Sequence, residues 1–576
     1  MPLSKNLKNL AIELGKNNSV ALKKFLKRHD PNINVEGQNY ILNDDQFSDV
    51  ILNFVNKPNS KISSGYFTSD MVYMRHLEFR TKIGFKNFRR FVEFDPIELS
   101  GIGILVGGNG SGKSTVVKAM LLTNEYLKSD SLDVFNFQPN NTEDANIVTL
   151  KRALNQNGKG KILEFNLSRD GYKFNIKVSG DLDKTIGQVD ELVIEDEKWG
   201  ISYEIMPKQN SVSITWYLHD ECEKLKENID KQTRSRDNLK IKKSKIKNKK
   251  SPEYGVLDSK IKKIDSNIKN IEIQLETKLK GFSLKTTYTE YNIKSILKEA
   301  FSIFLSESES QIASYKNRKK KNKELDAYIS FENKREALKK SIEDIRDATE
   351  NHTIVYLGAC LLKQSTLFAI REKTNALAQA IHDFVQEGIY DNQKSEAHTF
   401  VKKWMGPEHF NIGKSLEIKL IGGEAYEVNV ENNGLKIPLA DFGTGTIQVL
   451  LLILRLATVL EWREKMSGYY TVIIEEPELN LHPASQSKLA EVFHEVYSTH
   501  KIKVIIETHS EYLVRKTQLL VKNNGYENKG KTNPFSVIYF DQNKHWPLVY
   551  NNDGTFYNSF GKGFYDESSN LILNLL

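Results

Sequence analysis

Hydrophobic and polar positions change their period several times along the chain. From Met74 to about residue 215 they alternate, as in MRHLEFRTKIGFKNFRRFVEFDPIEL, and the apolar run GIGILV leads into a glycine-rich turn. Period-two alternation is typical of half-buried strands, and a short apolar run bounded by glycine is typical of a buried strand. Strand patterns return after Trp404 and continue almost to the end. The pattern therefore predicts an α/β protein whose strands come from two separated parts of the chain.

The segment between these parts has a helical pattern. A heptad seam is formed by Leu257, Ile261, Ile264, Ile268, Ile271, Leu275 and Leu279, and a weaker repeat precedes it. Pro252 and Gly255 break helix between the two repeats, so we expect an antiparallel coiled-coil hairpin. The alternative, one long solvated helix, is disfavoured by Pro252. Further helices are expected at about 314–348 and 352–400.

Residues 1–74 read as a small helical extension. Apolar residues recur at helical spacing from Leu7 to Leu26, and Asp44 can cap a second helix that runs to Val55. The expected organisation thus has four parts: a helical extension at 1–74, an N-terminal lobe at 75–217, a helical and coiled-coil insertion at 218–400, and a C-terminal lobe at 401–576.

Composition narrows the class of protein. The chain has 576 residues, of which 39% are hydrophobic and 27% charged, and its formal net charge is +8. The two cysteines, Cys222 and Cys360, are far apart in sequence, which argues against a disulfide framework or a zinc site and suits a reducing compartment. No apolar run reaches the roughly 18 to 20 residues of a membrane helix, and the first residues lack the pattern of a secretory signal. We expect a cytoplasmic protein with no membrane contact.

The strongest chemical signal is a phosphate-binding loop. It has the pattern G-x-x-x-x-G-K-[ST] and reads Gly107, Gly108, Asn109, Gly110, Ser111, Gly112, Lys113, Ser114 and Thr115. Glycines let the backbone N–H groups point at phosphates. Lys113 adds a cation, Ser114 offers a hydroxyl to Mg²⁺, and the helix expected from Ser114 adds its dipole. The loop predicts ATP and Mg²⁺ as ligands.

Two more apolar strands end in polar groups suited to phosphate chemistry. TVII is followed by Glu475 and Glu476, and KVIIET is followed by His509. One carboxylate can hold the hydrated metal and the next can polarise the attacking water. We assign Glu475 to the metal and Glu476 to the water, and we expect His509 to contact the γ-phosphate or orient the water. A lone acidic pair or histidine is more often a solvated turn, but here each accompanies a phosphate-binding loop.

A fourth motif lies before a long apolar helix. Gly443, Thr444 and Gly445 precede IQVLLLILRLATVL, and a glycine-flanked hydroxyl at a helix start is an anion-binding arrangement. Lys113 already serves the phosphate of its own chain, so this turn is free to serve the nucleotide of a second molecule.

Together and in this order, the four motifs resemble the set of the ABC ATPases, and the lobes split by a coiled coil resemble the SMC-like branch of that class. EEPELNLHP, ETHS, KNFRRF and DFGTGT in place of the usual signature are similar to the ATPase part of the overcoming-lysogenization-defect (OLD) family. Within its anti-phage relatives, the ATPase subunits of Septu-type and retron-associated defence systems are the nearest resemblance, and the PARIS ATPase is an alternative. The resemblance covers about 76–215 and 401–576.

The resemblance implies an ATPase head that works as a homodimer or higher homo-oligomer, with two ATP molecules between two heads. Thr444, with Gly443 and Gly445, would contact the partner's γ-phosphate, and Arg89 would approach the nucleotide. Gln138 is the candidate for the metal-contacting glutamine of the family. Glu475 departs from the more usual Asp. The stretch after His509 contains no acidic triad of a toprim nuclease, so the resemblance implies a separate nuclease of the HNH type. For a retron it also implies a reverse transcriptase and nucleic acid.

Two other function classes remain as alternatives. The first is a DNA-repair or chromosome-maintenance ATPase that grips DNA directly, because ten Lys or Arg and a single acid, Asp237, lie between Lys231 and Lys250. A solvated coiled-coil face explains that run equally well. The second, the nucleotide-binding subunit of a transporter, is disfavoured by the inserted coiled coil.

Overall fold

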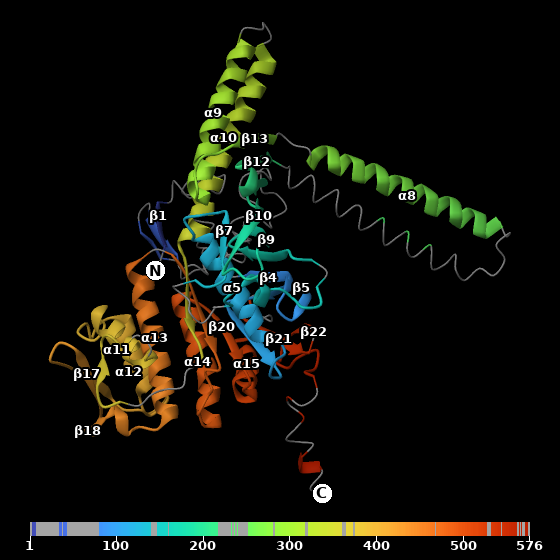
Figure 1. Ribbon diagram of the computed structural model, residues 1–576. Coiled ribbons are helices and arrows are strands. Elements are labelled where there is room, and N and C mark those ends of the chain that lie inside the picture. Colours follow the sequence, from blue (N-terminus) through green and yellow to red (C-terminus); the bar gives the residue numbers. More distant parts are fainter. Residues whose placement is uncertain are drawn as a thin grey trace. The chain divides into compact units, whose positions relative to one another are not determined.

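The computed structural model divides the chain into two compact units, Met1–Arg80 with Arg169–Gly171, and the remainder. Figure 1 shows the chain coloured along its sequence. The structure describes residues 3–6, 34–36, 39–42, 80–139, 147–158, 160–216, 232, 236, 239, 252–279, 283–316, 321–359, 365–372, 375–466, 468–526, 532–542, 544–561, 564, 566 and 571–573.

The described part of the first unit consists of strands. β1 (Leu3–Asn6), β2 (Asn34–Glu36) and β3 (Asn39–Leu42) form an antiparallel sheet in the order β1-β3-β2. The helices expected at 7–26 and 44–55 lie outside the described residues. The helical character of this extension is therefore not confirmed.

The second unit is built on a six-stranded sheet in the order β14-β19-β20-β6-β21-β22. All its neighbours are parallel except the β21–β22 pair. Its strands are β6 (Ile102–Gly107), β14 (His352–Leu357), β19 (Tyr469–Glu475), β20 (Lys503–Thr508), β21 (Phe535–Asp541) and β22 (Lys544–Leu548). Apolar runs such as ILV and VII occur because both faces of the sheet are buried. Ile473 and Ile505 enter one core, while Val472 and Val504 enter the other.

A second, nine-stranded sheet and helix α5 (Lys113–Leu127) form the first of these cores. The strand order is β13-β12-β11-β10-β9-β8-β4-β5, with β7 paired to β10. The strands are β4 (Thr81–Phe88), β5 (Phe91–Leu99), β7 (Val134–Asn136), β8 (Leu163–Arg169), β9 (Tyr172–Ser179), β10 (Ile186–Asp196), β11 (Ile201–Met206), β12 (Ser211–Trp216) and β13 (Ser283–Thr287). The first turn of α5 is the end of the phosphate-binding loop, so this packing fixes the loop.

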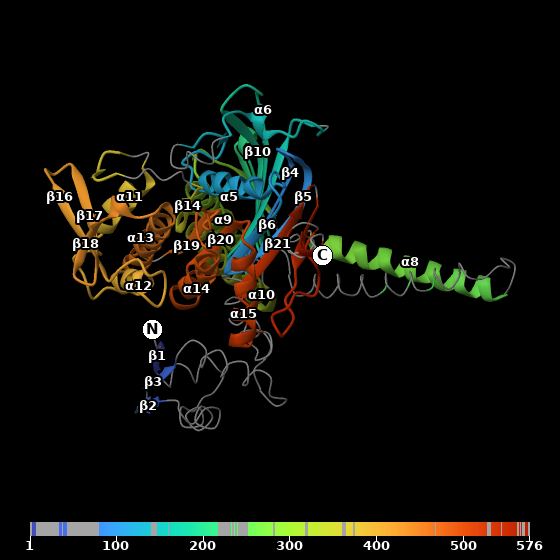
Figure 2. The same cartoon turned by 90° about the horizontal axis from the view of Figure 1, so that it is seen from below.

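Helices of the C-terminal part form the second core. They are α11 (Ala376–Gln386), α12 (Glu396–Met405), α13 (Thr444–Lys465), α14 (Pro483–His500) and α15 (Glu511–Asn524). Figure 2 shows α12 and α13 between the central sheet and a small outer sheet. Among the described helices α13 alone is long and apolar enough to cross a membrane, but 78% of its most apolar 18-residue stretch is buried inside the fold. That burial is what a core helix shows.

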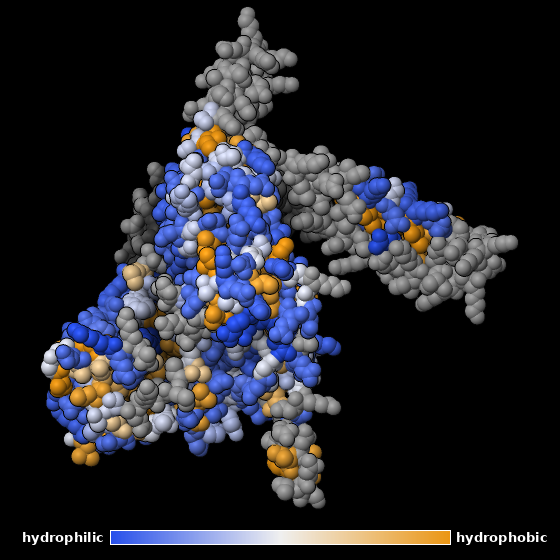
Figure 3. Space-filling view, in the orientation of Figure 1, coloured by the Kyte–Doolittle hydropathy of each residue, from blue (hydrophilic) through white to orange (hydrophobic). Residues whose placement is uncertain are grey.

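The outer sheet contains β15 (Phe368–Ala369), β16 (Ser415–Ile421), β17 (Ala425–Asn432) and β18 (Leu435–Pro438). One of its faces packs on α11 through Tyr426 and Val428. Its two hairpin turns carry exposed apolar side chains, Leu420 and Ile421 beside the β16–β17 turn and Leu435 beside the β17–β18 turn, and hydrophobic residues gather in this part of Figure 3.

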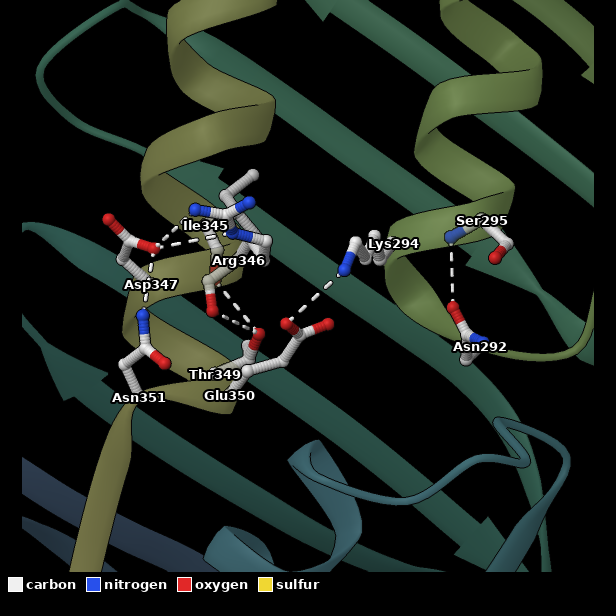
Figure 4. Close-up of polar contacts among 9 residues, drawn as sticks. All are labelled: Asn292, Lys294, Ser295, Ile345, Arg346, Asp347, Thr349, Glu350 and Asn351. Atoms are coloured by element: carbon white, nitrogen blue, oxygen red, sulfur yellow. Dashed lines mark hydrogen bonds and ion pairs between the residues drawn. The ribbon is translucent and has the colours of Figure 1, made fainter. Parts of the chain in front are cut away.

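Helices of the insertion leave the second sheet before and after β13, its last strand along the chain. α8 (Pro252–Leu279) precedes β13, and α9 (Ile293–Lys316) and α10 (Lys321–Glu350) follow it. Arg236 is helical and lies 3.4 Å from Asp265 of α8. Figure 4 shows the base of the α9–α10 pair, where Lys294 Nζ lies 3.5 Å from a Glu350 oxygen.

The insertion differs from the expected one at three places. Gly255 lies inside α8 and does not break it, whereas Pro252 begins this helix, because proline lacks only an N–H that the first turn leaves unpaired anyway. β13 belongs to the second sheet through its pairing with β12. Residues His352–Leu357 are strand β14 of the central sheet rather than helix. Their β-branched run, TIV, fits a strand beside β19. The expected end of the insertion at residue 400 is therefore too late, because the chain re-enters the central sheet at His352.

Candidate nucleotide site

The phosphate-binding loop follows β6 and ends in α5, as the pattern predicts. Glycine is required at Gly107 and Gly112, whose φ angles are 146° and 111°. A Cβ on Gly107 would lie 2.2 Å from the Phe540 carbonyl oxygen, and one on Gly112 would lie 2.4 Å from Phe91 Cζ. At Gly108 and Gly110 a Cβ would meet nothing within 4 Å. The loop thus packs against the protein at Gly107 and Gly112, and it is open at Gly108 and Gly110, where a phosphate can enter.

Lys113 and Ser114 meet a carboxylate from another strand. Lys113 is 3% exposed, and its Nζ donates to the carbonyl oxygens of Gly107 and Gly108, each at 3.1 Å. Glu507 Oε1 accepts a 2.9 Å hydrogen bond from Ser114 Oγ and lies 3.7 Å from Lys113 Nζ. Burial raises the pKa of Glu507 to about 7; the Glu475 carboxylate adds to this, and Lys113 opposes it.

Glu475 and Glu476 end β19 at the same edge of the sheet. Glu475 stands directly opposite Glu507 in the β19–β20 register. Glu476 has a φ of 48°, which is uncommon for a residue with a side chain, and its N–H donates to the Glu507 carbonyl oxygen at 2.7 Å. This bond holds the chain where it turns out of the sheet. The Glu476 side chain remains one-third exposed, so it can reach a water above the loop.

His509 faces Glu476. Its Nε2 lies 3.8 Å from Glu476 Oε1, and burial lowers its pKa, an effect that the Lys113 cation strengthens and Glu476 opposes. The backbone N–H of His509 donates to Glu478 Oε1 at 2.6 Å. Glu478 is 8% exposed, and burial raises its pKa. It therefore fixes the loop that carries His509.

The structure thus brings Lys113, Ser114, Glu475, Glu476 and His509 to one edge of the central sheet. Two carboxylates that the sequence analysis did not single out, Glu507 and Glu478, join them. Glu507 ends an apolar run two residues before His509, and Glu478 lies two residues after Glu476. An acid this close to a motif residue is a sequence signal that could have identified both residues as site candidates.

The Gly443–Gly445 turn lies elsewhere along the edge. Gly443 is the N-cap of α13, no side chain caps this helix, and its first turn has no acidic residue. Thr444 is exposed, and a Cβ on Gly445 would lie 2.4 Å from the carbonyl oxygen of Asn480, in the loop after β19. Because β20 separates β19 from β6, this turn is displaced from the phosphate-binding loop. Among the described residues no side chain caps this helix, so its first turn can offer N–H groups to an anion.

Arg89 and Gln138 are not brought to the loop by any contact among the described residues. The Arg89 N–H donates to the Ala153 carbonyl at 2.6 Å, and its φ is 52°. Its neighbour Arg90 lies closer to the site, because a Cβ on Gly112 would be 3.1 Å from Arg90 Cδ. Gln138 follows β7, is exposed, and donates its N–H to Asn136 Oδ1. The roles of Arg89 and Gln138 stay predictions.

The residues present fit a magnesium ion. Mg²⁺ takes oxygen ligands, usually one or two carboxylates together with substrate phosphates. Ser114 and Glu507 supply such oxygens beside the loop, and Glu475 lies opposite Glu507. The buried Glu507 Oε2 has no hydrogen-bond partner among the described residues, so one oxygen is left for a cation.

A family model described as the AAA ATPase domain matches residues 81–514, well over half of the chain. The chain belongs to this AAA ATPase family. The match begins at β4 and spans all four motifs of this ATPase. ATP binding follows from the family, and Mg²⁺ usually accompanies it. None of the curated proteins matches this ATPase.

Solved structures similar to this ATPase are SMC head domains. One is the Smc head domain with an extended coiled coil bound to the C-terminal domain of ScpA from Pyrococcus furiosus, with 13% identity, a TM-score of 0.31, and coverage of 86% of this chain and 99% of that chain. Another is the SMC head domain from Thermotoga maritima, with 9% identity, a TM-score of 0.31, and coverage of 82% and 99%. These scores are too low to transfer any property of those proteins to this one.

Proposed function

We propose that this ATPase binds and hydrolyses MgATP at sites shared between two copies, and that the resulting dimer controls a separate nuclease in bacterial anti-phage defence. The observation that carries this proposal is the cluster around Lys113, which has a phosphate-binding loop, a hydroxyl, four carboxylates and His509 at one sheet edge. Such a cluster can neutralise phosphate charge, hold a metal and activate water within one site.

Each residue has a role in this proposal. Lys113 and the loop N–H groups bind the phosphates, Ser114 and Glu475 hold Mg²⁺, and Gln138 is a further candidate ligand. Mg²⁺ would neutralise the charge that develops on the phosphates. Glu476 polarises the attacking water, which its partial exposure allows. Burial lowers the pKa of His509, which favours the neutral imidazole, and in that form the ring can accept or donate a hydrogen bond.

The shared site rests on the position of Thr444. The turn is exposed, no side chain caps its helix, and no contact among the described residues joins it to the phosphate-binding loop of its own chain. It begins a 22-residue helix whose dipole favours an anion. A second copy facing the first would place this turn on the partner's γ-phosphate. The active species is then a homodimer or a higher homo-oligomer.

The defence role rests on the motifs EEPELNLHP, ETHS and DFGTGT. By their resemblance, the partner is a nuclease of the HNH type encoded next to this ATPase, as in Septu-type systems. A retron-associated system would add a reverse transcriptase and its nucleic acid. In this proposal ATP turnover sets whether the nuclease is held or released.

A second candidate is an SMC-like ATPase of DNA repair or chromosome maintenance. The observation that favours it is the run from Lys231 to Lys250, with ten Lys or Arg and one acid. A basic run of this kind can neutralise several phosphates, and such binding weakens steeply with salt. In this case the chain itself would grip DNA.

One reconstitution separates the two candidates. We expect the purified chain to leave plasmid DNA and RNA intact at every concentration, and cleavage to appear only when the neighbouring nuclease is added. Cleavage by the chain alone, at a rate that follows its concentration, would contradict the proposal. Salt-sensitive DNA binding by the chain alone that is lost in Lys242→Glu/Lys243→Glu, without an effect of the nuclease, would favour the second candidate.

A further inference from the structure

Glu507 is a buried carboxylate whose two oxygens have different surroundings. Its side chain is 6% exposed. Oε1 accepts the hydrogen bond of Ser114 Oγ and lies near Lys113 Nζ, whereas Oε2 is buried without a hydrogen-bond partner among the described residues. An ionised carboxylate has about four lone-pair positions, and leaving one oxygen unpaired in the interior is costly. Lys113 alone does not remove this cost, since its Nζ contacts Oε1.

A second carboxylate lies on the neighbouring strand. Glu475 and Glu507 occupy paired positions of β19 and β20, so their side chains leave the sheet on the same face. Two carboxylates in this arrangement repel each other unless a cation lies between them. The hydroxyl of Ser114, the expected magnesium ligand of the loop, is bonded to the same Glu507. These three groups converge from three different elements: α5, β19 and β20.

We propose that Glu507 is a second carboxylate ligand of the Mg²⁺ that accompanies ATP, acting together with Glu475 and Ser114. The inference rests on the proposed ATPase function and adds a residue to its metal site. Glu475 stands where Asp is more usual, and its longer side chain moves the carboxylate further from the strand. A second carboxylate, from the neighbouring strand β20, would compensate for this change. Glu507 also contacts Ser114 Oγ and Lys113 Nζ.

The test measures metal binding rather than turnover. Mn²⁺ stands in for Mg²⁺ and is titrated by electron paramagnetic resonance, in the presence of a non-hydrolysable ATP analogue. We expect Glu507→Gln to lower the Mn²⁺ affinity about 10-fold or more, the scale of losing a group that holds a metal. Affinity for the analogue in EDTA should stay near that of the wild type, because the amide still accepts from Ser114.

Glu461→Gln is the matched control. Glu461 of α13 is buried to a similar degree, its Oε2 also lacks a hydrogen-bond partner among the described residues, and its Oε1 lies 3.3 Å from Lys465 Nζ. The Mn²⁺ affinity of this variant should stay close to the wild-type value. An unchanged Mn²⁺ affinity in Glu507→Gln would overturn the inference. An equal loss of nucleotide affinity with and without metal would also overturn it. That pattern would mean that Glu507 acts only by positioning Lys113 or by supporting the fold.

A second variant covers the case in which Glu507→Gln does not fold. Glu507→Cys, made together with Cys222→Ser and Cys360→Ser, places a soft ligand at the same position. We expect it to bind Cd²⁺ more tightly than the parent with only the two serine changes, and Mn²⁺ more weakly. No gain in Cd²⁺ affinity would contradict the inference. Failure of the wild type to bind the nucleotide at all would instead count against the proposed function.

Discussion

Replacing Lys113 with alanine is expected to abolish ATP binding. The side chain is 3% exposed and is the cation that the loop places beside Glu507 and the carbonyls of Gly107 and Gly108. Without it, the β- and γ-phosphates would face Glu507 and Glu475 with no side-chain cation of the loop. Breaking a buried charge pair costs about 3–5 kcal/mol, which corresponds to at least about a 100-fold loss of affinity.

Isothermal titration with ATP and Mg²⁺ measures this loss. Lys151→Ala is a suitable control, since that lysine is 70% exposed and its nearest acid is at 4.0 Å. The control should bind ATP as the wild type does. Undiminished affinity in Lys113→Ala, with the fold intact by circular dichroism, would refute the assignment of the phosphate-binding loop.

Glu476→Gln is expected to keep ATP binding and to slow hydrolysis by about 10²-fold or more, the scale of losing a general base. The Glu476 Oε1 lies 3.8 Å from His509 Nε2, and the side chain is one-third exposed. Glutamine keeps its size and hydrogen-bonding capacity but cannot take a proton. ATP that binds and is not hydrolysed should hold two heads together, so the variant should accumulate as a closed dimer.

Phosphate release and light scattering with ATP measure the two effects together. Glu511→Gln provides the control, because Glu511 pairs with Arg515 on the surface of α15 and makes no contact with the loop among the described residues. Normal turnover in Glu476→Gln would move the catalytic role to Glu475 or Glu478. A variant that binds ATP, fails to hydrolyse it and remains monomeric would argue against closure by ATP.

The parts of the fold that the sequence predicts well are those with a strong local signal. The buried run before Gly107, the helix after Lys113 and the apolar helix after Thr444 occur where the pattern places them. Each has a boundary set by glycine and a long apolar run, so local preference and burial agree. The helical pattern that continues past residue 350 wrongly predicts helix at His352–Leu357, because pairing with β19 makes this segment a strand.

The candidate site is predictable only in part, for a similar reason. Motifs identify the residues that each strand carries, but which of them touch depends on strand order and register. The sequence does not single out Glu507, because an acid before Thr508 and His509 cannot be assigned to the site until β20 is known to lie between β19 and β6. The register of β19 and β20 then pairs it with Glu475. Arg90 is nearer to Gly112 than the expected Arg89 because the backbone turns at Arg89.

The central claim is that each ATP site is completed by a second copy, and mixing two defective chains tests it most directly. Thr444→Arg adds a bulky cation at an exposed position, so binding of ATP to one head should survive while closure is blocked. Lys113→Ala removes binding in its own loop. A heterodimer of the two variants has one site with both defects and one with neither.

The account predicts that this mixture recovers part of the ATPase activity that each variant alone lacks. A control mixture of Lys113→Ala with wild type measures how strongly one inactive site lowers the ATPase activity of the other. This value sets how much activity the test mixture can recover. If every chain completes its own site, each site in the mixture carries one defect and no activity returns. Absence of recovery, with heterodimers shown to form and the control mixture active, would contradict the shared site.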